Sequence, residues 1–389
     1  MLYAKKKLKI AIIFKPYRPL KIPFTGGMMY YVYFLAKGLA DRGHQVTVMA
    51  GQDAKLPNNV KLIKAKYDKD KMDVYHAHDE FYEDIFKNCK SPREIINRSF
   101  GELAGRFDKK IEIYLQYLTL AHNGKFDVIH VVTHDILALY PALFLSVPTV
   151  VSFHGHYKIL GDDFLAWLKF IKKNKLRHNC NFVSVSKYIQ KEYGCFVKSK
   201  LIYNSIDIAP YKLNTGQRDD YLIWIGRIDY NKGLDRAVQI ALKLKQKLYF
   251  AGPIENQYLF DTKIKPYIDN KNIKYLGILN EQQKNKYISR AKAMFFPTRG
   301  EEAFGRVAVE SLACGTPVIT YDKGGLSEIV VNKKTGFIIR ENNLADVKRA
   351  LANLNKIKPE VCRKFVEKNF ILGKMIGEYE KFYQRCVKN

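Results

Sequence analysis

The stretch PTRGEEAFGRVAVESLACGTPVI, residues 297–319, decides how this chain is built. It follows the apolar run Ala293–Phe296, which has the composition of a buried strand, and it begins with a loop that carries two adjacent glutamates. We predict a helix that begins near Phe304 and ends at Gly315, because a glycine with Pro317 just beyond it is a typical stop signal. A strand, a loop, a helix and a further strand in this order indicate an α/β fold with a mostly parallel sheet.

The start of the predicted helix has the chemistry of an anion site. A helix N-terminus offers free backbone N–H groups and a positive dipole, which suit a phosphate, and Gly305 lets a ligand approach the backbone closely. Glu302 lies in the loop, and Glu310 lies eight residues further on inside the helix. Each carboxylate can accept hydrogen bonds from two vicinal hydroxyls of a sugar. Taken alone, a surface-loop glutamate and a helix-face glutamate are the simpler interpretation.

A second segment of the same half of the chain also suits a phosphate. GRIDYNKG, residues 226–233, comes directly after the predicted strand Tyr221–Ile225. Arg227 can hold phosphate oxygens with its planar guanidinium, and Lys232 adds a point charge. Sheets of this kind bind ligands outside the carboxyl ends of their strands, which is where this segment falls. In a chain with 66 Lys and Arg residues, however, one basic turn is weak evidence by itself.

Strand and helix patterns alternate through both halves of the chain. The first half has predicted strands over Lys9–Phe14, Gln45–Ala50, Phe126–Val132, Thr149–Phe153 and Phe182–Ser186, and helices over Met28–Arg42 and Lys187–Tyr193. The second half has a helix from Leu234 and strands over Tyr221–Ile225, Leu248–Ala251, Ile273–Leu276, Ala293–Phe296 and Pro317–Thr320. The halves meet near Asn204–Asp207, and a last helix, Phe370–Val387, is free to cross back onto the first half.

The composition bounds the class of protein. At roughly 100–200 residues per domain, 389 residues correspond to two domains. Hydrophobic residues at 47% and charged residues at 27% are typical of a globular protein and exclude a disordered chain, a collagen or a small disulfide scaffold. The six cysteines are scattered without a C-x-x-C pair, which indicates free thiols in a reducing compartment. The net charge of +28 predicts attraction to phosphates, nucleic acid or anionic lipid.

Two segments resemble membrane signals in composition. The apolar run Ile10–Phe14 is too short for a signal peptide, which needs about 7–15 apolar residues. The segment Ile136–Phe153 has no charged residue, but Pro141 and Pro148 divide it. A helix, a turn and a buried strand are therefore predicted there, and no membrane-spanning segment is expected.

The segment Asp162–Arg177 combines an apolar stripe with a basic face. The stripe is formed at helical spacing by Phe164, Trp167, Leu168 and Ile171, and the basic face by Lys169, Lys172, Lys173, Lys175 and Arg177. This composition is typical of a helix that docks on an anionic membrane. It is also that of an ordinary helix whose stripe is part of the core, which is the commoner case.

The segment 64–123 is polar and mostly helical in composition. It contains two histidines and two carboxylates close together, His76, His78, Asp79 and Glu80. These side chains can bind a metal, but their spacing is not that of the tight ligand pairs of zinc sites. A solvated loop or helix start is therefore the simpler interpretation.

Together these segments resemble the family 4 retaining glycosyltransferases, which have the GT-B fold. The block formed by Gly226-Arg227 and Lys232-Gly233, followed by the E-x7-E pair Glu302 and Glu310, is the specific part of the resemblance. Further motifs occur in the family's order over nearly the whole chain: Gly26-Gly27 after the first strand, FDVIH at 126–130, FHG at 153–155, YNSID at 203–207, and Gly324-Gly325 with Glu328.

The resemblance implies the architecture. In the GT-B fold, two Rossmann-like domains with parallel sheets face each other across a cleft, and the C-terminal helix crosses back to the first domain. An N-terminal, acceptor-binding domain would comprise residues 1–205, with residues 370–389 packing back on it. A C-terminal, nucleotide-sugar-binding domain would comprise residues 206–369.

The resemblance also implies roles in the second domain. Arg227 and Lys232 would bind the donor diphosphate. Glu302 would hold hydroxyls of the donor sugar, and Glu310 would bind the ribose hydroxyls. Backbone of the same two segments would complete the donor site, at Gly226, Ala303, Phe304 and Gly305.

Two elements of the first domain would complete the cleft. Gly26 and Gly27 would close over the phosphates, and His154 would lie near the transferred sugar. The sequence departs from the family's pattern at Ser205 and Ala303, where glycine is usual. The methyl group of Ala303 lies where sugar is expected, so this position bears on the identity of the donor.

The implied reaction needs no metal and no other cofactor. Breaking a glycosyl–phosphate bond leaves negative charge on the diphosphate, and Arg227, Lys232 and a helix N-terminus are aimed there. No Asp-x-Asp occurs where it would hold a metal-bound nucleotide. A retaining mechanism with two carboxylates needs them about 5–5.5 Å apart, and no such pair is identified. The resemblance instead implies front-face attack, in which the leaving phosphate takes the acceptor proton.

The sequence therefore predicts a hexosyltransferase of glycan biosynthesis. It would move a hexose or N-acetylhexosamine from a nucleotide diphosphate sugar to a glycan, lipid-linked or small-molecule acceptor, and the resemblance favours UDP over GDP. We expect a cytoplasmic protein, with an anionic membrane at its cytoplasmic face as a further candidate partner. A nucleotide-sugar epimerase of the same fold is the nearest alternative, and it would release UDP without glycosylating an acceptor.

A nucleic-acid-binding protein is the rival from another class. It is argued from the charge of +28 and from 26 Tyr and 23 Phe residues. No RNP-like run, zinc-finger spacing or dense arginine stripe supports it, and the basic residues are dispersed along the chain. No nucleic-acid partner is therefore expected.

Overall fold

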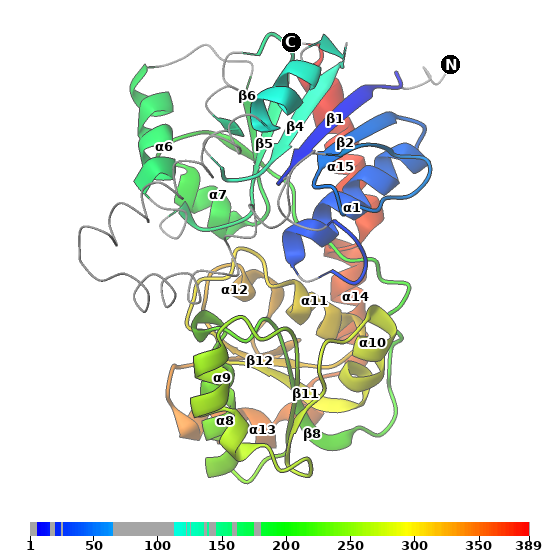
Figure 1. Cartoon of the computed structure of the whole chain (residues 1–389). Helices are drawn as coiled ribbons and strands as arrows, with labels where there is room; N and C mark the ends of the chain where they lie inside the picture. The colour runs from blue at the N-terminus through cyan, green and yellow to red at the C-terminus, as the bar shows by residue number, and fades with distance from the viewer. Residues whose placement is uncertain are drawn as a thin grey trace, which may run out of the picture.

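Two parallel sheets, one in each half of the chain, organise the computed structural model (Figure 1). The structure describes residues 6–15, 20–24, 26–64, 113–121, 123–124, 126–135, 138–139, 145–157, 162–174 and 180–388. The cluster at residues 76–80, for which a solvated loop or helix start is the simpler interpretation, lies outside these ranges. The architecture is that of the GT-B fold, as the resemblance implied.

The first sheet has the order β3-β2-β1-β4-β5-β6-β7, and all its neighbouring strands are parallel. Its strands are β1 (Lys9–Phe14), β2 (Gln45–Ala50), β3 (Lys61–Lys64), β4 (Val128–Val132), β5 (Thr149–Phe153), β6 (Cys180–Ser184) and β7 (Ser199–Leu201). The named helices of this half are α1 (Gly27–Asp41), α6 (Asp162–Asn174) and α7 (Lys187–Tyr193). The central strands β4 and β5 are buried throughout, because helices cover both faces of a parallel sheet.

The second sheet has the order β10-β9-β8-β11-β12-β13 and is also parallel. Its strands are β8 (Asp219–Ile225), β9 (Leu248–Ala251), β10 (Ile273–Tyr275), β11 (Ala291–Phe296), β12 (Val318–Tyr321) and β13 (Gly336–Ile339). The helices are α8 (Leu234–Lys243), α9 (Gln257–Lys263), α10 (Glu281–Arg290), α11 (Arg306–Ala313), α12 (Leu326–Ile329), α13 (Leu344–Ala352) and α14 (Pro359–Asn369). Short 3₁₀ turns lie at η2 (Tyr230–Lys232), η3 (Lys265–Tyr267) and η4 (Leu354–Lys356).

Three strands escaped the sequence prediction, namely β3, β7 and β13. Each lies at an edge of its sheet and is partly exposed, so it lacks the continuous apolar run that marks a buried strand. The predicted strand Phe182–Ser186 was placed too late, because β6 already ends at Ser184. Ser186 is the N-cap of α7, and its hydroxyl accepts a hydrogen bond from the backbone N–H of Ile189 at 3.1 Å.

The last helix, α15 (Leu372–Cys386), returns to the first sheet and packs beside α1 (Figure 1). The two helices approach closely at Gly38, where a Cβ atom would lie 2.0 Å from a side-chain carbon of Ile376. Arg42 forms an ion pair with the nearly buried Glu380 at 3.0 Å. The outgoing and returning chains also meet, since the backbone N–H of Ile206 donates to the carbonyl of Phe370 at 3.0 Å.

The apolar stripe of α6 belongs to the core. Phe164, Trp167, Leu168 and Ile171 are all buried, while Lys169, Lys172 and Lys173 are exposed. The core interpretation of this stripe is therefore confirmed, and docking of the basic residues on an anionic membrane stays a prediction. The remaining two basic residues of the predicted face lie outside the described part of the chain.

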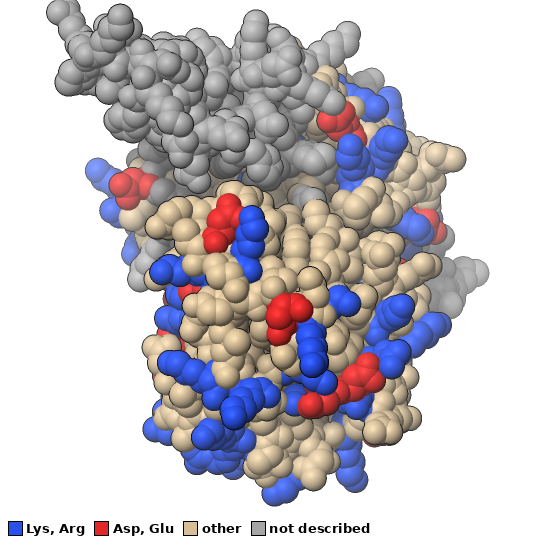
Figure 2. Space-filling view, turned by 60° about the horizontal axis from the view of Figure 1, so that its bottom comes forward, with Lys and Arg blue, Asp and Glu red and all other residues tan. Residues whose placement is uncertain are grey.

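Basic side chains are spread over the face of the molecule shown in Figure 2, which is formed mainly by the second half of the chain. Asp and Glu side chains lie among them in smaller number. On this face the positive charge is distributed and does not form one stripe. Within the described ranges, no helix combines the length and the apolar character needed to cross a membrane.

Candidate active site

A cavity of about 360 Å³ lies where the two sheets face each other. Elements of both halves line it, because the carboxyl ends of both sheets open toward it. Every predicted site residue except Glu310 lines this cavity: Gly26, Gly27, His154, Gly226, Arg227, Lys232, Glu302, Ala303, Phe304 and Gly305.

The strand order explains why two segments 75 residues apart meet at this cavity. β8 and β11 are neighbours in the second sheet, and both point their carboxyl ends at the cleft. Gly226 and Arg227 follow β8 directly, and the loop to Glu302 follows β11. Ligands of open α/β sheets bind at such a point, where connections leave neighbouring strands in opposite directions.

The N-terminus of α11 opens into the cavity without a side-chain cap. Within the described residues, the backbone N–H groups of Phe304, Gly305 and Arg306 donate no hydrogen bond. Gly305 has φ 99°, and a Cβ atom there would lie 2.6 Å from a side-chain carbon of Leu326. Glycine is therefore required at this turn, and the helix end presents free donors to an anion.

The basic turn after β8 is built by a short-range cap. The carboxylate of Asp229 accepts a hydrogen bond from the backbone N–H of Lys232 at 3.1 Å and so closes η2. Gly233 follows with φ 70°, and a Cβ atom there would lie 2.3 Å from the carbonyl oxygen of Pro297. The turn thus packs directly on the loop that leads to Glu302.

Both predicted phosphate-binding cations are paired with carboxylates. Lys232 forms a close ion pair with Glu302. Arg227 pairs with Glu255 at 2.5 Å and with Asp229 at 3.4 Å, and its side chain remains 42% exposed. These contacts hold the cations at the cavity wall, and a bound diphosphate would compete with the carboxylates for them.

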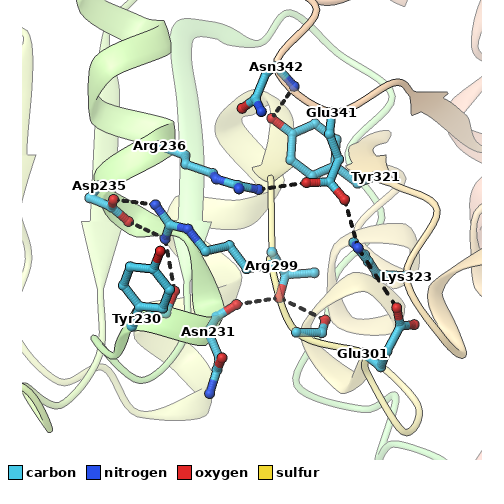
Figure 3. Close-up of polar contacts among 12 residues, drawn as sticks. Tyr230, Asn231, Asp235, Arg236, Arg299, Glu301, Tyr321, Lys323, Glu341 and Asn342 are labelled. Carbon is cyan, nitrogen blue, oxygen red and sulfur yellow. Dashed lines mark hydrogen bonds and ion pairs between the residues drawn. The ribbon is translucent and has the colours of Figure 1, made fainter.

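A polar network holds the basic turn against the loop of the two glutamates (Figure 3). The guanidinium of Arg299 donates to both carboxylate oxygens of Asp235, at 2.5 and 2.7 Å, and lies 4.2 Å from the ring centroid of Tyr230. The carbonyl of Asn231 accepts from the backbone N–H of Arg299 at 2.8 Å and of Gly300 at 3.0 Å. Such bidentate pairs fix geometry as well as adding energy.

A second part of the network reaches the cavity from the other side (Figure 3). Glu341 bridges Arg236 at 3.0 Å and Lys323 at 2.6 Å, and Lys323 also lies 3.8 Å from Glu301. The hydrogen bond from Lys323 lowers the pKa of Glu341. Loops after β8, β11, β12 and β13 are thereby connected around the site.

Glu310 does not line the cavity and is fully buried. Its carboxylate contacts the ammonium of Lys284 at 3.2 and 3.3 Å and the guanidinium of Arg306 at 3.4 Å. Both cations do line the cavity, so they lie between Glu310 and the ligand space. The predicted contact of Glu310 with ribose stays a prediction.

Glu281 completes a charge-balanced cluster around Lys284. It pairs with Lys284 at 2.7 Å and accepts a hydrogen bond from the hydroxyl of Tyr211. Burial alone would raise the pKa of Glu281, but Lys284 and Arg306 together lower it. Sequence reasoning missed Lys284 and Arg306, because nothing in their local pattern distinguishes a buried cation from an exposed one.

Tyr30 of α1 joins the two halves at this cluster. Its ring centroid lies 4.3 Å from the guanidinium carbon of Arg306. Its hydroxyl accepts a hydrogen bond from the backbone N–H of Asp207 at 2.6 Å. A cation–π contact and a backbone hydrogen bond thus come from one side chain at the domain junction.

The motif Gly324-Gly325…Glu328 contacts the loop that carries Glu302 and also crosses to the first half. The backbone N–H of Gly325 donates to the carbonyl of Glu302 at 2.7 Å. The carboxylate of Glu328 accepts from the N–H groups of Lys187 at 2.9 Å and Tyr188 at 2.7 Å, at the start of α7. A carboxylate at a helix N-terminus is stabilised by the helix dipole.

His154 follows β5 and faces the cavity from the first half. Its Nε2 lies 2.8 Å from the hydroxyl of Ser152, and its ring centroid lies 4.3 Å from that of Tyr31. Burial, with Lys15 nearby, lowers the pKa of His154 to about 3. The imidazole is therefore neutral at ordinary pH, and it offers hydrogen bonds and not a charge.

The cavity thus gathers cations and free N–H groups on one wall and a neutral histidine on the other. The cations and the helix end suit phosphate oxygens, and the carboxylates suit hydroxyl groups. This combination fits a ligand with a charged diphosphate and a sugar, and it defines the chain as an α/β transferase of the GT-B class.

Two sequence profiles identify the family. The profile described as Glycosyltransferase Family 4 matches residues 25–209, and the one described as Glycosyl transferases group 1 matches residues 206–370. The chain belongs to this family of glycosyltransferases. The sequence analysis considered an enzyme and a nucleic-acid-binding protein, and family membership supports the enzyme.

Relatives found by sequence similarity agree with this family assignment. The chain is 26% identical over 370 residues to an uncharacterized glycosyltransferase of Methanocaldococcus jannaschii, covering 86% of each chain. It is 24% identical over 381 residues to the glycogen synthase of Mycobacterium tuberculosis, covering 89% of this chain and 86% of the relative.

Solved structures share the fold. Sucrose-phosphate synthase of Thermosynechococcus elongatus matches with a TM-score of 0.75 and 18% identity, covering 98% of this chain and 100% of the other. HepE of Anabaena, solved in complex with UDP-glucose, matches with a TM-score of 0.69 and 14% identity, covering 97% of this chain and 100% of the other.

Proposed function

We propose that this glycosyltransferase moves a hexose or N-acetylhexosamine from a UDP-sugar to a glycan, lipid-linked or small-molecule acceptor, with retention of configuration. One observation carries the proposal: Arg227, Lys232 and the free N–H groups of α11 line one wall of the cavity that His154 lines from the other half. The choice of UDP is supported by HepE, a structural neighbour solved with UDP-glucose.

The chain's own residues would carry the charge of the reaction. When the glycosyl–phosphate bond breaks, negative charge develops on the diphosphate, and two cations and a helix N-terminus are already placed at the cavity wall. Donors that are fixed before the reaction cost no reorganisation when the charge appears. We therefore propose catalysis without a metal ion.

Retention would follow from attack on the same face that the diphosphate leaves. Family resemblance supports this route, in which the leaving phosphate accepts the proton of the attacking hydroxyl. Glu302, paired with Lys232 by one oxygen, would use its other oxygen for a sugar hydroxyl. This assigns Glu302 to positioning of the sugar and the cations to the leaving group.

A binding screen tests the donor. Thermal and chemical unfolding are measured with UDP-glucose, UDP-N-acetylglucosamine, GDP-mannose and no ligand. A donor at 100 times its dissociation constant adds about 2.7 kcal/mol to the free energy of unfolding. We expect this gain with a UDP-sugar and not with the GDP-sugar. No gain with any nucleotide sugar contradicts the proposal, and release of UDP without a glycosylated acceptor points to an epimerase.

Glu302→Gln tests the site, and Glu301→Gln is its matched control. Glu301 is the neighbouring carboxylate, 41% exposed and 3.8 Å from Lys323. We expect Glu302→Gln to lose transfer while the affinity for UDP changes little, and Glu301→Gln to keep most of its transfer activity. Unchanged turnover in Glu302→Gln would contradict the assignment of Glu302 to positioning of the sugar.

A further inference from the structure

Three buried polar side chains connect the last helix of the chain to His154. The hydroxyl of Tyr383 on α15 lies 2.6 Å from Nδ1 of His130. Nε2 of His130 lies 2.9 Å from the hydroxyl of Ser152, which lies 2.8 Å from Nε2 of His154. The first three of these residues are fully buried. The connection runs without a break from α15 to the ring that lines the cavity.

The sheet brings these groups together. His130 on β4 pairs in register with Val150 on β5, so its side chain shares a face of the sheet with Ser152, two residues further along β5. Ser152 and His154 are two residues apart, the spacing that places side chains on the same face of an extended chain. Tyr383 is far from the other three residues in the sequence, and it reaches them because α15 crosses back to this sheet.

The direction of the hydrogen bonds follows from Tyr383. Its hydroxyl has one hydrogen-bond partner among the described residues, Nδ1 of His130. If the hydroxyl accepted from His130, its own hydrogen would be buried without an acceptor, which is costly. Burial also raises the pKa of Tyr383, so the hydroxyl keeps its hydrogen. Tyr383 therefore donates, and His130 carries its proton on Nε2.

The Ser152 hydroxyl also faces the hydroxyl of Tyr31, but its hydrogen-bond geometry is met only with the two histidines. For these two bonds, one arrangement leaves no buried hydrogen without an acceptor. Nε2–H of His130 donates to the oxygen of Ser152. Since a serine hydroxyl has a single hydrogen, it is free to donate to Nε2 of His154. A neutral His154 that accepts at Nε2 carries its proton on Nδ1.

We propose that Tyr383, His130 and Ser152 are positioning residues that set the tautomer of His154, so that its Nδ1–H is the hydrogen-bond donor offered to the ligand. Resting on the proposed function, this makes His154 a donor to an oxygen of the transferred sugar and not a base. It also gives α15 a part in catalysis beyond packing. Burial supports the neutral ring, because it lowers the pKa of both His154 and His130.

The same helix supplies a matched control. Tyr379 lies one turn before Tyr383 and is equally buried; its hydroxyl faces that of Tyr31 and makes no hydrogen bond with Tyr383, His130, Ser152 or His154. Tyr379→Phe and Tyr383→Phe each delete one buried hydroxyl from α15 with little change in shape. Only the second deletion removes a hydrogen bond of the connection.

The first experiment needs no substrate. Nitrogen NMR of protein labelled with ¹⁵N-histidine distinguishes a ring nitrogen that carries hydrogen from one that does not, and His154 is assigned by its loss in His154→Asn. We expect hydrogen on Nδ1 in the wild type and in Tyr379→Phe. In Ser152→Ala and Tyr383→Phe we expect a second tautomer of His154. Hydrogen on Nε2 in the wild type overturns the proposal.

The second experiment measures transfer with the donor found by the binding screen. We expect kcat/KM to fall about 2- to 10-fold in Tyr383→Phe, the effect of one hydrogen bond, and to stay unchanged in Tyr379→Phe. Equal kinetics and equal spectra in the two variants overturn the proposal. If the spectra agree with it but no nucleotide sugar binds, the proposed function fails while the tautomer assignment stands.

Discussion

The hydroxyl of Ser186 donates a hydrogen bond to the carbonyl oxygen of Ala303 at 2.6 Å, across the interface between the two domains. The same hydroxyl oxygen accepts the N–H of Ile189 and caps α7. Ala303 belongs to the loop that lines the cavity beside Glu302. One serine thus caps α7 and holds the loop between β11 and α11 in the other domain.

Ser186→Ala should therefore affect both stability and donor binding. Losing the cap costs about 1 kcal/mol, and losing the bond to Ala303 adds about 0.5–1.5 kcal/mol. We expect the free energy of unfolding to fall by about 1.5–2.5 kcal/mol and KM for the donor to rise. Ser186→Thr, which keeps the hydroxyl, should retain both properties. Equal behaviour of the two variants in denaturant titrations would contradict this role.

Lys284→Met should destabilise the fold strongly. It leaves the buried Glu310 with Arg306 alone and removes the cation paired with Glu281, and breaking a buried pair costs about 3–5 kcal/mol. Lys292→Met is the control, because Lys292 pairs with the exposed Asp220. Chemical denaturation measures both. A loss below 1 kcal/mol for Lys284→Met would mean that the pair contributes little.

The same variant tests the predicted role of Glu310. If Lys284 orients Glu310 toward ribose, wild-type protein should bind UDP more tightly than 2′-deoxy-UDP. That preference should shrink in Lys284→Met and return in Lys284→Arg. Calorimetry at a temperature where all variants are folded measures the ratio. If Lys284→Met still binds UDP more tightly than 2′-deoxy-UDP, Lys284 does not orient Glu310 toward ribose.

Arg227→Ala and Lys232→Ala should each slow the transfer step. A preorganised donor aimed at developing charge contributes about 2–4 kcal/mol to the barrier. We expect the effect mainly in kcat, because the charge is largest in the transition state. Arg236→Ala, in which a cation outside the cavity is lost, is the control. A near-normal kcat/KM in Arg227→Ala or Lys232→Ala would exclude that residue from the phosphate site.

Stability should fall as pH is lowered below about 6.5. Burial depresses the pKa of His130, His134 and His154 in the folded chain, that of His154 to about 3 from an ordinary value of 6.5. Between these values the unfolded chain binds more protons, so the free energy of unfolding rises with pH. Each such histidine contributes about 1.4 kcal/mol per pH unit. Denaturant titrations from pH 5 to 8 measure the slope, which His154→Asn should reduce. A flat profile would contradict the buried neutral histidines.

Trp167→Ala should cost about 3–5 kcal/mol, because Trp167 is fully buried in the core. Reversing the exposed charges of α6 (Lys169, Lys172 and Lys173 to Glu) should change the free energy of unfolding by less than about 1 kcal/mol. Chemical denaturation of both variants measures this. A small loss for Trp167→Ala would contradict the packing of α6.

The charge-reversed variant also tests an anionic membrane as partner. Each surface lysine near anionic lipid contributes about 1 kcal/mol. We expect the wild type to co-sediment with anionic liposomes at low salt and the variant to bind less. If the wild-type protein does not co-sediment with the liposomes, an anionic membrane is excluded as a partner. A water-soluble acceptor would then be favoured.

The sequence, with its resemblance to the family, determined the buried strands and ten of the residues that line the cavity. Apolar runs such as Lys9–Phe14 and Thr149–Phe153 mark strands that are covered on both faces, and their loops end at one edge of a parallel sheet. Local patterns therefore placed Arg227 and Glu302 after strands of the same half, and the resemblance to the family assigned them to one site. Short edge strands such as β3 and β13 were not predicted, because their partly exposed residues do not form a continuous apolar run.

Only the tertiary structure determined which side chains far apart in the sequence form hydrogen bonds or charge contacts. Ser186 meets Ala303, Tyr30 meets Arg306, and Tyr383 meets His130 across 253 positions of the chain. These contacts depend on the strand order and on the return of α15, which no local pattern encodes. Burial of Lys284 and Glu310 is decided in the same way, because the side chains that exclude water from an ion pair come from other elements of the fold.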